Sequence, residues 1–154
     1  MKIYFAGPLF SEPERNWIRG AIDRIHALTA ELNHPVNIIS PFELISTDDL
    51  MALGDETKRE LFDRCRTQLD TADLLIALLD GPQVDDGTAW EIGYFYAIRR
   101  AGTRIIGIRT DSRRAGEFKN SLVNAMVECS CDRIANSLDE LMGFLRGVFL
   151  GNGE

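Results

Sequence analysis

The feature that most restricts the possible folds is a regular alternation of short apolar runs with segments of helical periodicity. The clearest run covers residues 74–79, six apolar residues in a row that end at Asp80-Gly81-Pro82. Such a run is typical of a strand that is buried on both faces of a parallel sheet. Shorter runs predict further strands over residues 3–6, 36–39 and 104–108.

Helices are predicted between these strands. Ser11 and Glu14 have capping-box spacing, with a proline in the first turn, and Ser137 begins a second capping box. Residues 57–71 and about 87–100 also predict helices. Two segments have no single prediction: residues 48–54 are compatible with a loop that contains a helical turn, and residues 120–136 with a short helix and a short fifth strand. The face of the first helix consists of Ile18, Ala21, Ile25, Leu28 and Leu32.

This order of elements predicts an α/β fold, a doubly wound parallel sheet of the flavodoxin-like or Rossmann-like kind, in one domain over residues 1–154. Ligands of such sheets bind beyond the carboxyl ends of the strands, near the point where the strand order reverses. The loops expected at that edge are residues 7–11, 40–43, 80–87 and those from Arg109 onward.

Composition excludes several classes of protein. The net charge of −7 argues against a nucleic-acid partner, and the mixed charges of residues 109–114 are interpreted as a solvated loop. No apolar run is long enough for a membrane span, and the start of the chain does not resemble a signal peptide, so a cytoplasmic protein is expected. Metal binding is not expected, because the three cysteines and two histidines lack the spacing of a zinc site.

The most informative stretch is residues 79–94, which joins the buried strand to a helix. Gly87 allows a close approach of the backbone to a ligand. Glu91 falls in the first or second helical turn, where the helix N-terminus favours an ionised carboxylate, as a glycosyl nucleophile must be. A lone glutamate here would simply complement the helix dipole. Its neighbours Trp90, Ile92 and Gly93 instead predict a side chain that does not point freely into water.

Asp85 and Asp86 precede the same helix. Two carboxyl groups beside one sugar are the usual equipment for glycosidic cleavage, with one attacking and the other managing the proton. Either aspartate can also cap the helix. The hypothesis is that these roles are divided, with one aspartate facing the ligand and the other serving as the cap.

Three other catalytic patterns are not found. The chain contains no phosphate-binding P-loop motif, and the glycine-rich dinucleotide fingerprint is missing after the first strand. No histidine is suitably placed for a Ser-His-Asp triad, because His26 is expected on a helix surface.

The chain resembles the nucleoside 2-deoxyribosyltransferases over nearly its full length. The residues that carry the resemblance are the stretch 85–94, which is similar to the nucleophile motif of the family, the opening at 3–7, and Asn124-Ala125-Met126. The resemblance implies a five-stranded parallel sheet flanked by helices, no metal or organic cofactor, and deoxynucleoside and free nucleobase substrates. It also implies a homo-oligomer, from dimer to hexamer.

The resemblance also implies roles for individual residues. Glu91 is expected to form a covalent 2-deoxyribosyl ester, with Tyr4 orienting its carboxylate and Asp85 contacting the base and assisting its protonation. The substrate-binding residues are expected to be Phe10, which packs on the base, Gly7 and Gly87 in the adjoining loops, and Asn124 and Met126 from a neighbouring subunit.

Two residues depart from some members of the family. Leu9 stands where some have an aromatic residue, and Cys65 stands where some have an aspartate. Two alternative functions also remain. A related hydrolase would cleave 2′-deoxynucleoside 5′-monophosphates, but it needs phosphate donors and the loop at 7–12 contains no arginine. A non-catalytic nucleotide-binding module would have no reason to hold a nucleophile.

Overall fold

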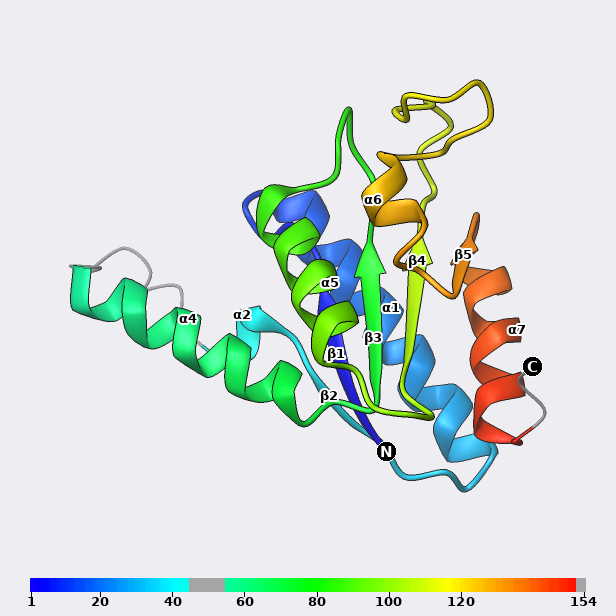
Figure 1. Cartoon of the computed structure of the whole chain (residues 1–154). Helices are drawn as coiled ribbons and strands as arrows, with labels where there is room; N and C mark the ends of the chain where they lie inside the picture. Colours follow the sequence, from blue (N-terminus) through cyan, green and yellow to red (C-terminus); the bar gives the residue numbers. More distant parts are fainter. Residues whose placement is uncertain (45–54, 152–154) are drawn as a thin grey trace.

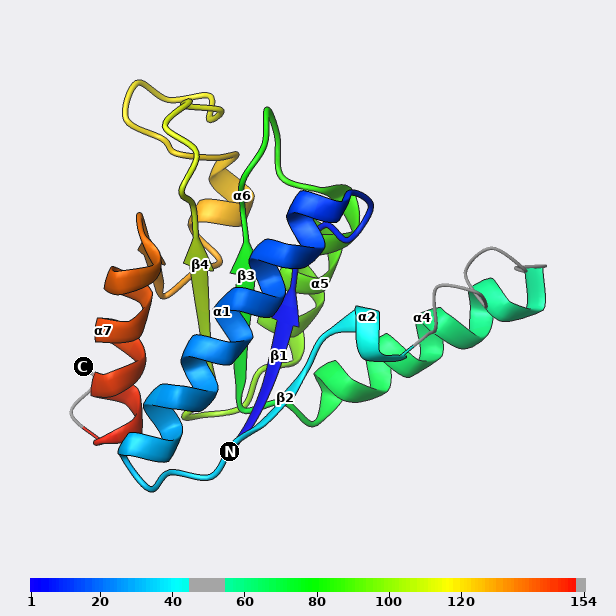
Figure 2. The same cartoon turned by 180° about the vertical axis from the view of Figure 1, so that it is seen from behind.

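A five-stranded, all-parallel sheet forms the centre of the protein, and helices cover both of its faces (Figures 1 and 2). The computed structural model describes residues 1–44 and 55–151. The strand order is β2-β1-β3-β4-β5, which is the flavodoxin-like one of the two arrangements expected. The strands are β1 (Lys2–Ala6), β2 (Asn37–Ile39), β3 (Leu74–Leu78), β4 (Arg104–Ile108) and β5 (Arg133–Ala135).

The helices begin close to the residues that the sequence indicates. Ser11 caps α1 with both halves of a capping box, since its hydroxyl accepts from Glu14 N and its own N–H donates to the Glu14 carboxylate. Ser137 caps α7, although the Glu140 carboxylate accepts from Asn136 N rather than from Ser137 N. The helices are α1 (Glu12–Glu31), α2 (Pro41–Leu44), α4 (Asp55–Asp70), α5 (Asp86–Ile98), α6 (Ala125–Glu128) and α7 (Leu138–Phe149).

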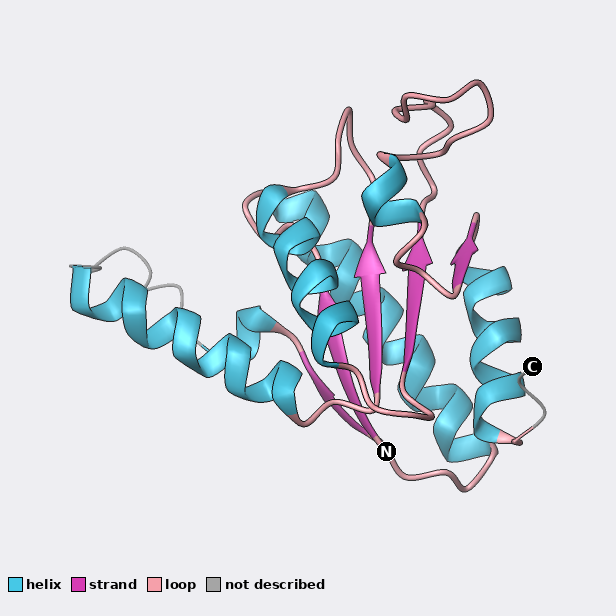
Figure 3. Ribbon diagram, viewed as in Figure 1, coloured by secondary structure: helices cyan, strands magenta, loops and turns pink. Residues whose placement is uncertain are grey.

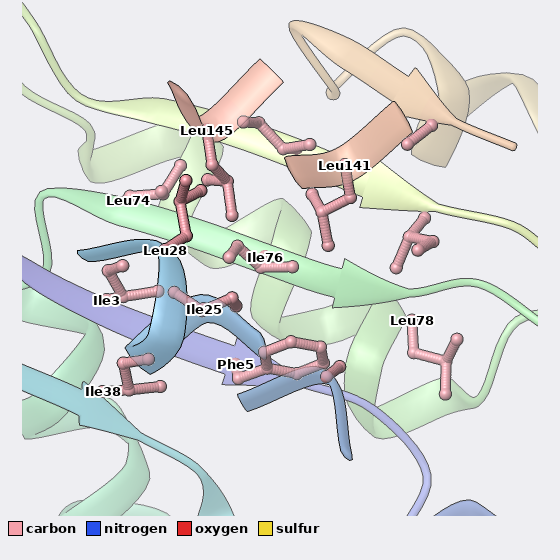
Figure 4. Close-up of a cluster of buried hydrophobic side chains, with 14 of the residues drawn as sticks. Ile3, Phe5, Ile25, Leu28, Ile38, Leu74, Ile76, Leu78, Leu141 and Leu145 are labelled. Carbon is pink, nitrogen blue, oxygen red and sulfur yellow. The ribbon is translucent and has the colours of Figure 1, made fainter. Parts of the chain in front are cut away.

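Alternation along the central strands divides the apolar core into two layers. In β1, Ile3 and Phe5 face α1 and α7, whereas Tyr4 and Ala6 face α4 and α5. Figure 4 shows the first layer, in which Ile25 of α1 lies among side chains of the strands and of α7. Because successive strand residues point to opposite faces, this register sends the Tyr4 side chain toward the helix that carries Glu91.

All strands point toward one edge of the sheet, where their arrowheads lie in Figure 3. The chain leaves β1 for β2 on one side and β3 for β4 on the other. The loops that follow β1 and β3 therefore diverge at this edge and leave a space between them, as expected for a ligand site at the switch point.

Arg109, at the end of β4, corrects one sequence-based expectation. It was expected in a solvated loop, but it is 2% exposed, and its guanidinium donates to the carbonyl oxygens of Leu79, Gly81 and Arg113. Carbonyl groups that leave a sheet lose their ladder partners and need other donors. Arg109 supplies them and thereby connects the loops after β3 and β4.

The segments that the sequence left open have different outcomes. Residues 120–136 contain α6 and β5, so the expected short helix and fifth strand are both confirmed. Residues 48–54 lie outside the described residues.

His26 is exposed on α1, as expected. In the part of the chain that the structure describes, no helix has the length and apolar character needed to cross a membrane.

Candidate active site

A cavity of about 280 Å³ opens at the switch point of the sheet. The loop after β1, the start of α2, the middle of α4 and the first two turns of α5 all contribute to its walls. The cavity therefore combines segments that lie up to about eighty residues apart in the chain. Its lining residues are Gly7, Leu9, Phe10, Pro41, Leu61, Cys65, Asp85, Gly87, Thr88 and Glu91.

Glu91 lies in the second turn of α5 and is partly buried, as its apolar neighbours indicate. The Tyr4 hydroxyl donates to Glu91 Oε1 at 2.5 Å. Tyr4 itself is fully buried in β1. A rigid central strand thus holds one oxygen of the carboxylate, while the residue remains part of the cavity wall. The expected pairing of these two side chains is present in the structure.

The electrostatics of Glu91 correct a second expectation. The helix start was expected to keep this carboxylate ionised, yet its pKa is raised to about 7, mainly because burial removes water from the charged form. The Tyr4 hydrogen bond lowers the pKa, and the negative charge of Asp85 raises it. Desolvation is the largest of these three effects, and Glu91 lies in the second turn of the helix, where the dipole is weaker than at its first residues. The carboxylate is therefore divided between its two protonation states near neutral pH.

The groups around Tyr4 keep its hydroxyl protonated. Burial raises the pKa of Tyr4 far above its usual value, and the nearby negative charge of Glu91 raises it further. Cys65 of α4 also hydrogen-bonds with Tyr4, and burial raises the pKa of its thiol as well. Tyr4 is consequently a fixed hydrogen-bond donor to the carboxylate, and the departure at Cys65 places a neutral thiol beside this pair.

Asp85 takes both of the positions that were expected for two different aspartates, since it caps α5 and also lines the cavity. Its Oδ2 caps α5 by accepting from Thr88 N (2.8 Å) and Thr88 Oγ1 (2.9 Å), and the residue also lines the cavity. Asp86 is exposed and is not the cap; its Oδ1 accepts from Gly87 N. The expected division of positions is therefore not seen, because the cap and the place in the cavity wall belong to the same aspartate. Because the cap uses Oδ2 for both bonds, Oδ1 of Asp85 is outside the cap.

The other expected residues of this loop region also reach the cavity. Phe10 is 81% exposed and presents an aromatic ring at its rim. Gly7 lies where a Cβ would come within 2.9 Å of Ile18 Cδ1 and 3.1 Å of Leu78 Cβ, so a side chain there would force Ile18 and Leu78 to shift. Gly87 lines the wall in the first turn of α5.

Asn124 and Met126 are not part of this cavity lining. Asn124 caps α6 by accepting from Met126 N (2.9 Å), and its amide nitrogen donates to Glu117. Met126 is 79% exposed. Within one chain, the structure thus brings together Glu91, Tyr4, Asp85 and the loop residues, but it leaves the Asn124–Met126 pair on a separate surface.

Sequence reasoning did not assign several of the residues at the site, among them Thr88, Pro41 and Phe62. Thr88 donates two hydrogen bonds to the Asp85 side chain, and Pro41, the first residue of α2, contributes to the cavity wall. Phe62 stands with Trp90 around a second hollow that shares Cys65, Gly87 and Glu91 with the first. Leu61, Cys65 and Leu69 are spaced four residues apart, which indicates the inner face of α4. This spacing does not predict that the face contacts α5 at the carboxyl edge of the sheet.

Comparisons with known proteins agree with this architecture. A family model described as nucleoside 2-deoxyribosyltransferase matches residues 3–126. An uncharacterized protein of Ureaplasma parvum serovar 3 is 30% identical over 149 residues, which cover 92% of each chain.

Solved structures with the same fold cover almost the whole chain. A conserved protein of Enterococcus faecalis V583 has 29% identity and a TM-score of 0.70, with 93% of this chain and 95% of that chain covered. A 2-deoxyribosyltransferase of Bacillus psychrosaccharolyticus has 19% identity and a TM-score of 0.67, with 94% and 92% covered. For a Leishmania mexicana 2-deoxyribosyltransferase the identity is 23%, the TM-score is 0.62, and 96% of each chain is covered. At such identities the last two similarities establish the fold.

Proposed function

Because this chain belongs to the nucleoside 2-deoxyribosyltransferase family, we propose that it transfers the 2-deoxyribosyl group between nucleobases by two successive displacements at one carbon. The observation that carries the proposal is the Glu91 carboxylate, which lines the switch-point cavity while a buried tyrosine holds one of its oxygens. A positioned carboxylate of this kind is suited to nucleophilic attack on an anomeric carbon.

In the first displacement, a Glu91 oxygen attacks C1′ of the deoxynucleoside and forms an ester bond. The C1′–N bond breaks, and its electron pair goes to the base nitrogen, which takes up a proton from solvent with the Asp85 carboxylate as the relay. In the second displacement, a nitrogen of the incoming base attacks C1′, the ester bond breaks, and the incoming base returns the proton. Two inversions give net retention of configuration.

The deoxy sugar suits this route chemically. Without an electron-withdrawing 2′-hydroxyl, the oxocarbenium-like transition state is easier to reach. Tyr4 stabilises the carboxylate before attack and again when the ester breaks, because its hydrogen bond is stronger to the charged form. The proposal requires no metal ion and no organic cofactor, since bond formation and proton transfer are both assigned to side chains of this chain.

The competing function is hydrolysis of deoxynucleoside 5′-monophosphates. A phosphate site needs donors such as arginine or lysine. Among the described residues that line the cavity, none carries a positive charge, and the two ionisable carboxylates, Asp85 and Glu91, would repel a phosphate. The lining therefore favours the nucleoside over the monophosphate. A binding module that lacks catalysis would not explain the buried Tyr4–Glu91 pair.

We further propose that the working unit is a homo-oligomer formed by a single-domain chain. In a site built as the family resemblance implies, Asn124 of a neighbouring copy binds the sugar hydroxyls with Met126 alongside. The exposure of Met126 and the separate position of α6 in one chain are compatible with this arrangement.

One incubation series separates these functions. The protein is incubated with deoxyinosine, with deoxyinosine plus free adenine, or with the 5′-monophosphate of deoxyinosine, and the products are separated by chromatography. Transfer predicts deoxyadenosine in the second mixture, slow release of hypoxanthine in the first, and a lower kcat/KM for the monophosphate. A higher kcat/KM for the monophosphate, with no deoxyadenosine formed, would replace transfer by hydrolysis.

A further inference from the structure

The loop that connects β1 to α1 forms a thin wall between two cavities. On one side, Leu9 and Phe10 line the switch-point cavity that contains Glu91. On the other side, Leu9 lines a second cavity of about 320 Å³, here called the rear cavity. The residues of the rear cavity are Leu9, Arg15, Ile18, Arg19, Ile22, Asp23 and Ser40. Leu9 packs against the first core layer with only part of its side chain, and Phe10 is 81% exposed, so close packing fixes this segment less than it fixes a core residue.

Arg15 supplies the contacts that packing does not. It belongs to the first turn of α1, and its Nη1 donates to the carbonyl oxygens of Leu9 (2.9 Å) and Phe10 (2.9 Å). Its backbone N–H also donates to Ser11 O at 3.2 Å. One guanidinium nitrogen therefore holds the main chain of the two residues whose side chains form the wall of the switch-point cavity.

We propose that Arg15 is a positioning residue that sets the Leu9–Phe10 wall and thereby selects which nucleobases fit beside Glu91. This inference rests on the proposed function, in which the base packs against Phe10. The attacking carboxylate is held independently, since Tyr4 of β1 and the helix α5 fix Glu91. Arg15 thus controls one wall of the substrate cavity without touching the reacting atoms.

This arrangement separates the effects on binding from those on chemistry. Loss of the two Arg15 hydrogen bonds frees the Leu9–Phe10 wall against which the base lies. The KM for the nucleoside therefore rises. The turnover of bound substrate depends on Glu91 and changes less. A wall that is free to move also accepts bases of different size more equally, so the preference between purine and pyrimidine deoxynucleosides weakens.

The test compares Arg15→Ala and Arg15→Gln with Arg24→Ala in the full-length protein. Glutamine keeps an N–H donor but loses the guanidinium charge. Arg24 is a matched control, because it carries the same charge on the same helix and pairs with Asp139 far from the loop. The measurements are kcat and KM for one purine and one pyrimidine deoxynucleoside, and hydrogen–deuterium exchange of the backbone amides of residues 7–11.

Arg15→Ala is expected to raise KM about tenfold, the scale of a hydrogen bond to a charged group, with kcat nearly unchanged and a smaller ratio between purine and pyrimidine kcat/KM. Amide exchange in residues 7–11 is expected to increase. Arg15→Gln should lie between Arg15→Ala and the wild type, and Arg24→Ala should match the wild type in every measurement.

An Arg15→Ala variant with wild-type KM and base preference would overturn the inference, and so would unchanged exchange in the loop. The exchange experiment needs no substrate. If the wild type proved unable to transfer deoxyribose, the proposed function would fail, whereas the exchange data would still decide whether Arg15 holds the wall.

Discussion

The Tyr4 hydroxyl donates a 2.5 Å hydrogen bond to Glu91 Oε1, across the contact between β1 and α5. The two residues are 87 positions apart in sequence, and the parallel sheet brings them together because Tyr4 lies on the face that α5 covers. This bond opposes the effect of burial on the carboxylate, since it favours the ionised form. The proposed nucleophile therefore depends on a residue of the central sheet.

Removal of that hydroxyl in Tyr4→Phe should slow the reaction while leaving the fold intact. A hydrogen bond to a charged group contributes about 1.5–3 kcal/mol, so kcat/KM at neutral pH should fall about 10- to 100-fold. Phenylalanine fills the same buried space, so the melting temperature should change little. Steady-state kinetics and thermal unfolding check both expectations.

Tyr94→Phe is the matched control for this substitution. Tyr94 donates a bond of similar length, 2.6 Å, to Asp70 Oδ1, away from the cavity. Its loss should leave kcat/KM near the wild-type value. Equal losses of activity in the two variants would mean that the Tyr4 hydroxyl has no special relation to Glu91.

The pKa of about 7 for Glu91 predicts a rate that depends on pH in the physiological range. Glu91 attacks as the carboxylate, so kcat/KM should rise with pH through about 7 and decline by roughly tenfold for each pH unit below. In Tyr4→Phe the acid limb of the kcat/KM profile should move to higher pH, because the hydrogen bond that lowers the Glu91 pKa is lost. A flat profile between pH 5 and 8 would contradict a buried carboxylate nucleophile.

Asp85 links activity with stability, and two substitutions separate these roles. Asp85→Ala removes the cap of α5 and should cost about 1 kcal/mol of folding free energy, or roughly 2–4 °C in melting temperature. Asp85→Asn keeps a good cap and should melt near the wild type. Both variants should lose activity, less than Glu91→Ala does, because proton transfer to the base is impaired.

Both Asp85 variants also remove a negative charge that raises the Glu91 pKa. The acid limb of kcat/KM should accordingly move to lower pH. A limb that stays in place in both variants would show that Asp85 and Glu91 do not interact electrostatically.

The proposed oligomer predicts complementation between two inactive variants. Glu91→Gln lacks the nucleophile, and Asn124→Ala lacks the proposed contact from the neighbouring copy. If each site takes Glu91 from one chain and Asn124 from another, an equal mixture of exchanging dimers should recover roughly a quarter of wild-type activity, since half of the dimers then hold one intact site. Subunit exchange is verified by native mass spectrometry.

Mixtures that exchange subunits but stay inactive would place Asn124 outside the neighbour's site. A fully active monomer, identified by light scattering coupled to an activity assay, would contradict the shared site altogether.

The fold was predictable from sequence because each element has a local signal. The apolar run at 74–79, the serine caps at Ser11 and Ser137, and the proline and glycine stops each depend on neighbouring residues. The choice of the flavodoxin-like strand order was not predictable in this way. It depends on whether β3 pairs with β2 or with the free side of β1, and periodicity carries no information about that choice.

The site was only partly predictable, for a similar reason. Glu91 and Asp85 belong to one short motif, and the family resemblance added Tyr4. The burial of Arg109 and the raised pKa of Glu91 were both missed. Each results from desolvation and from contacts between distant segments, so a count of charges along the chain cannot indicate them.

The most direct test of the proposed mechanism is to identify the residue that carries the sugar. The protein is mixed with deoxyinosine, quenched within the first turnover, and analysed by intact-protein mass spectrometry and peptide mapping. We expect one 2-deoxyribosyl adduct on the peptide that contains Glu91, and none in Glu91→Gln. An adduct on a peptide without Glu91, or transfer that proceeds with inversion at C1′, would contradict the assignment.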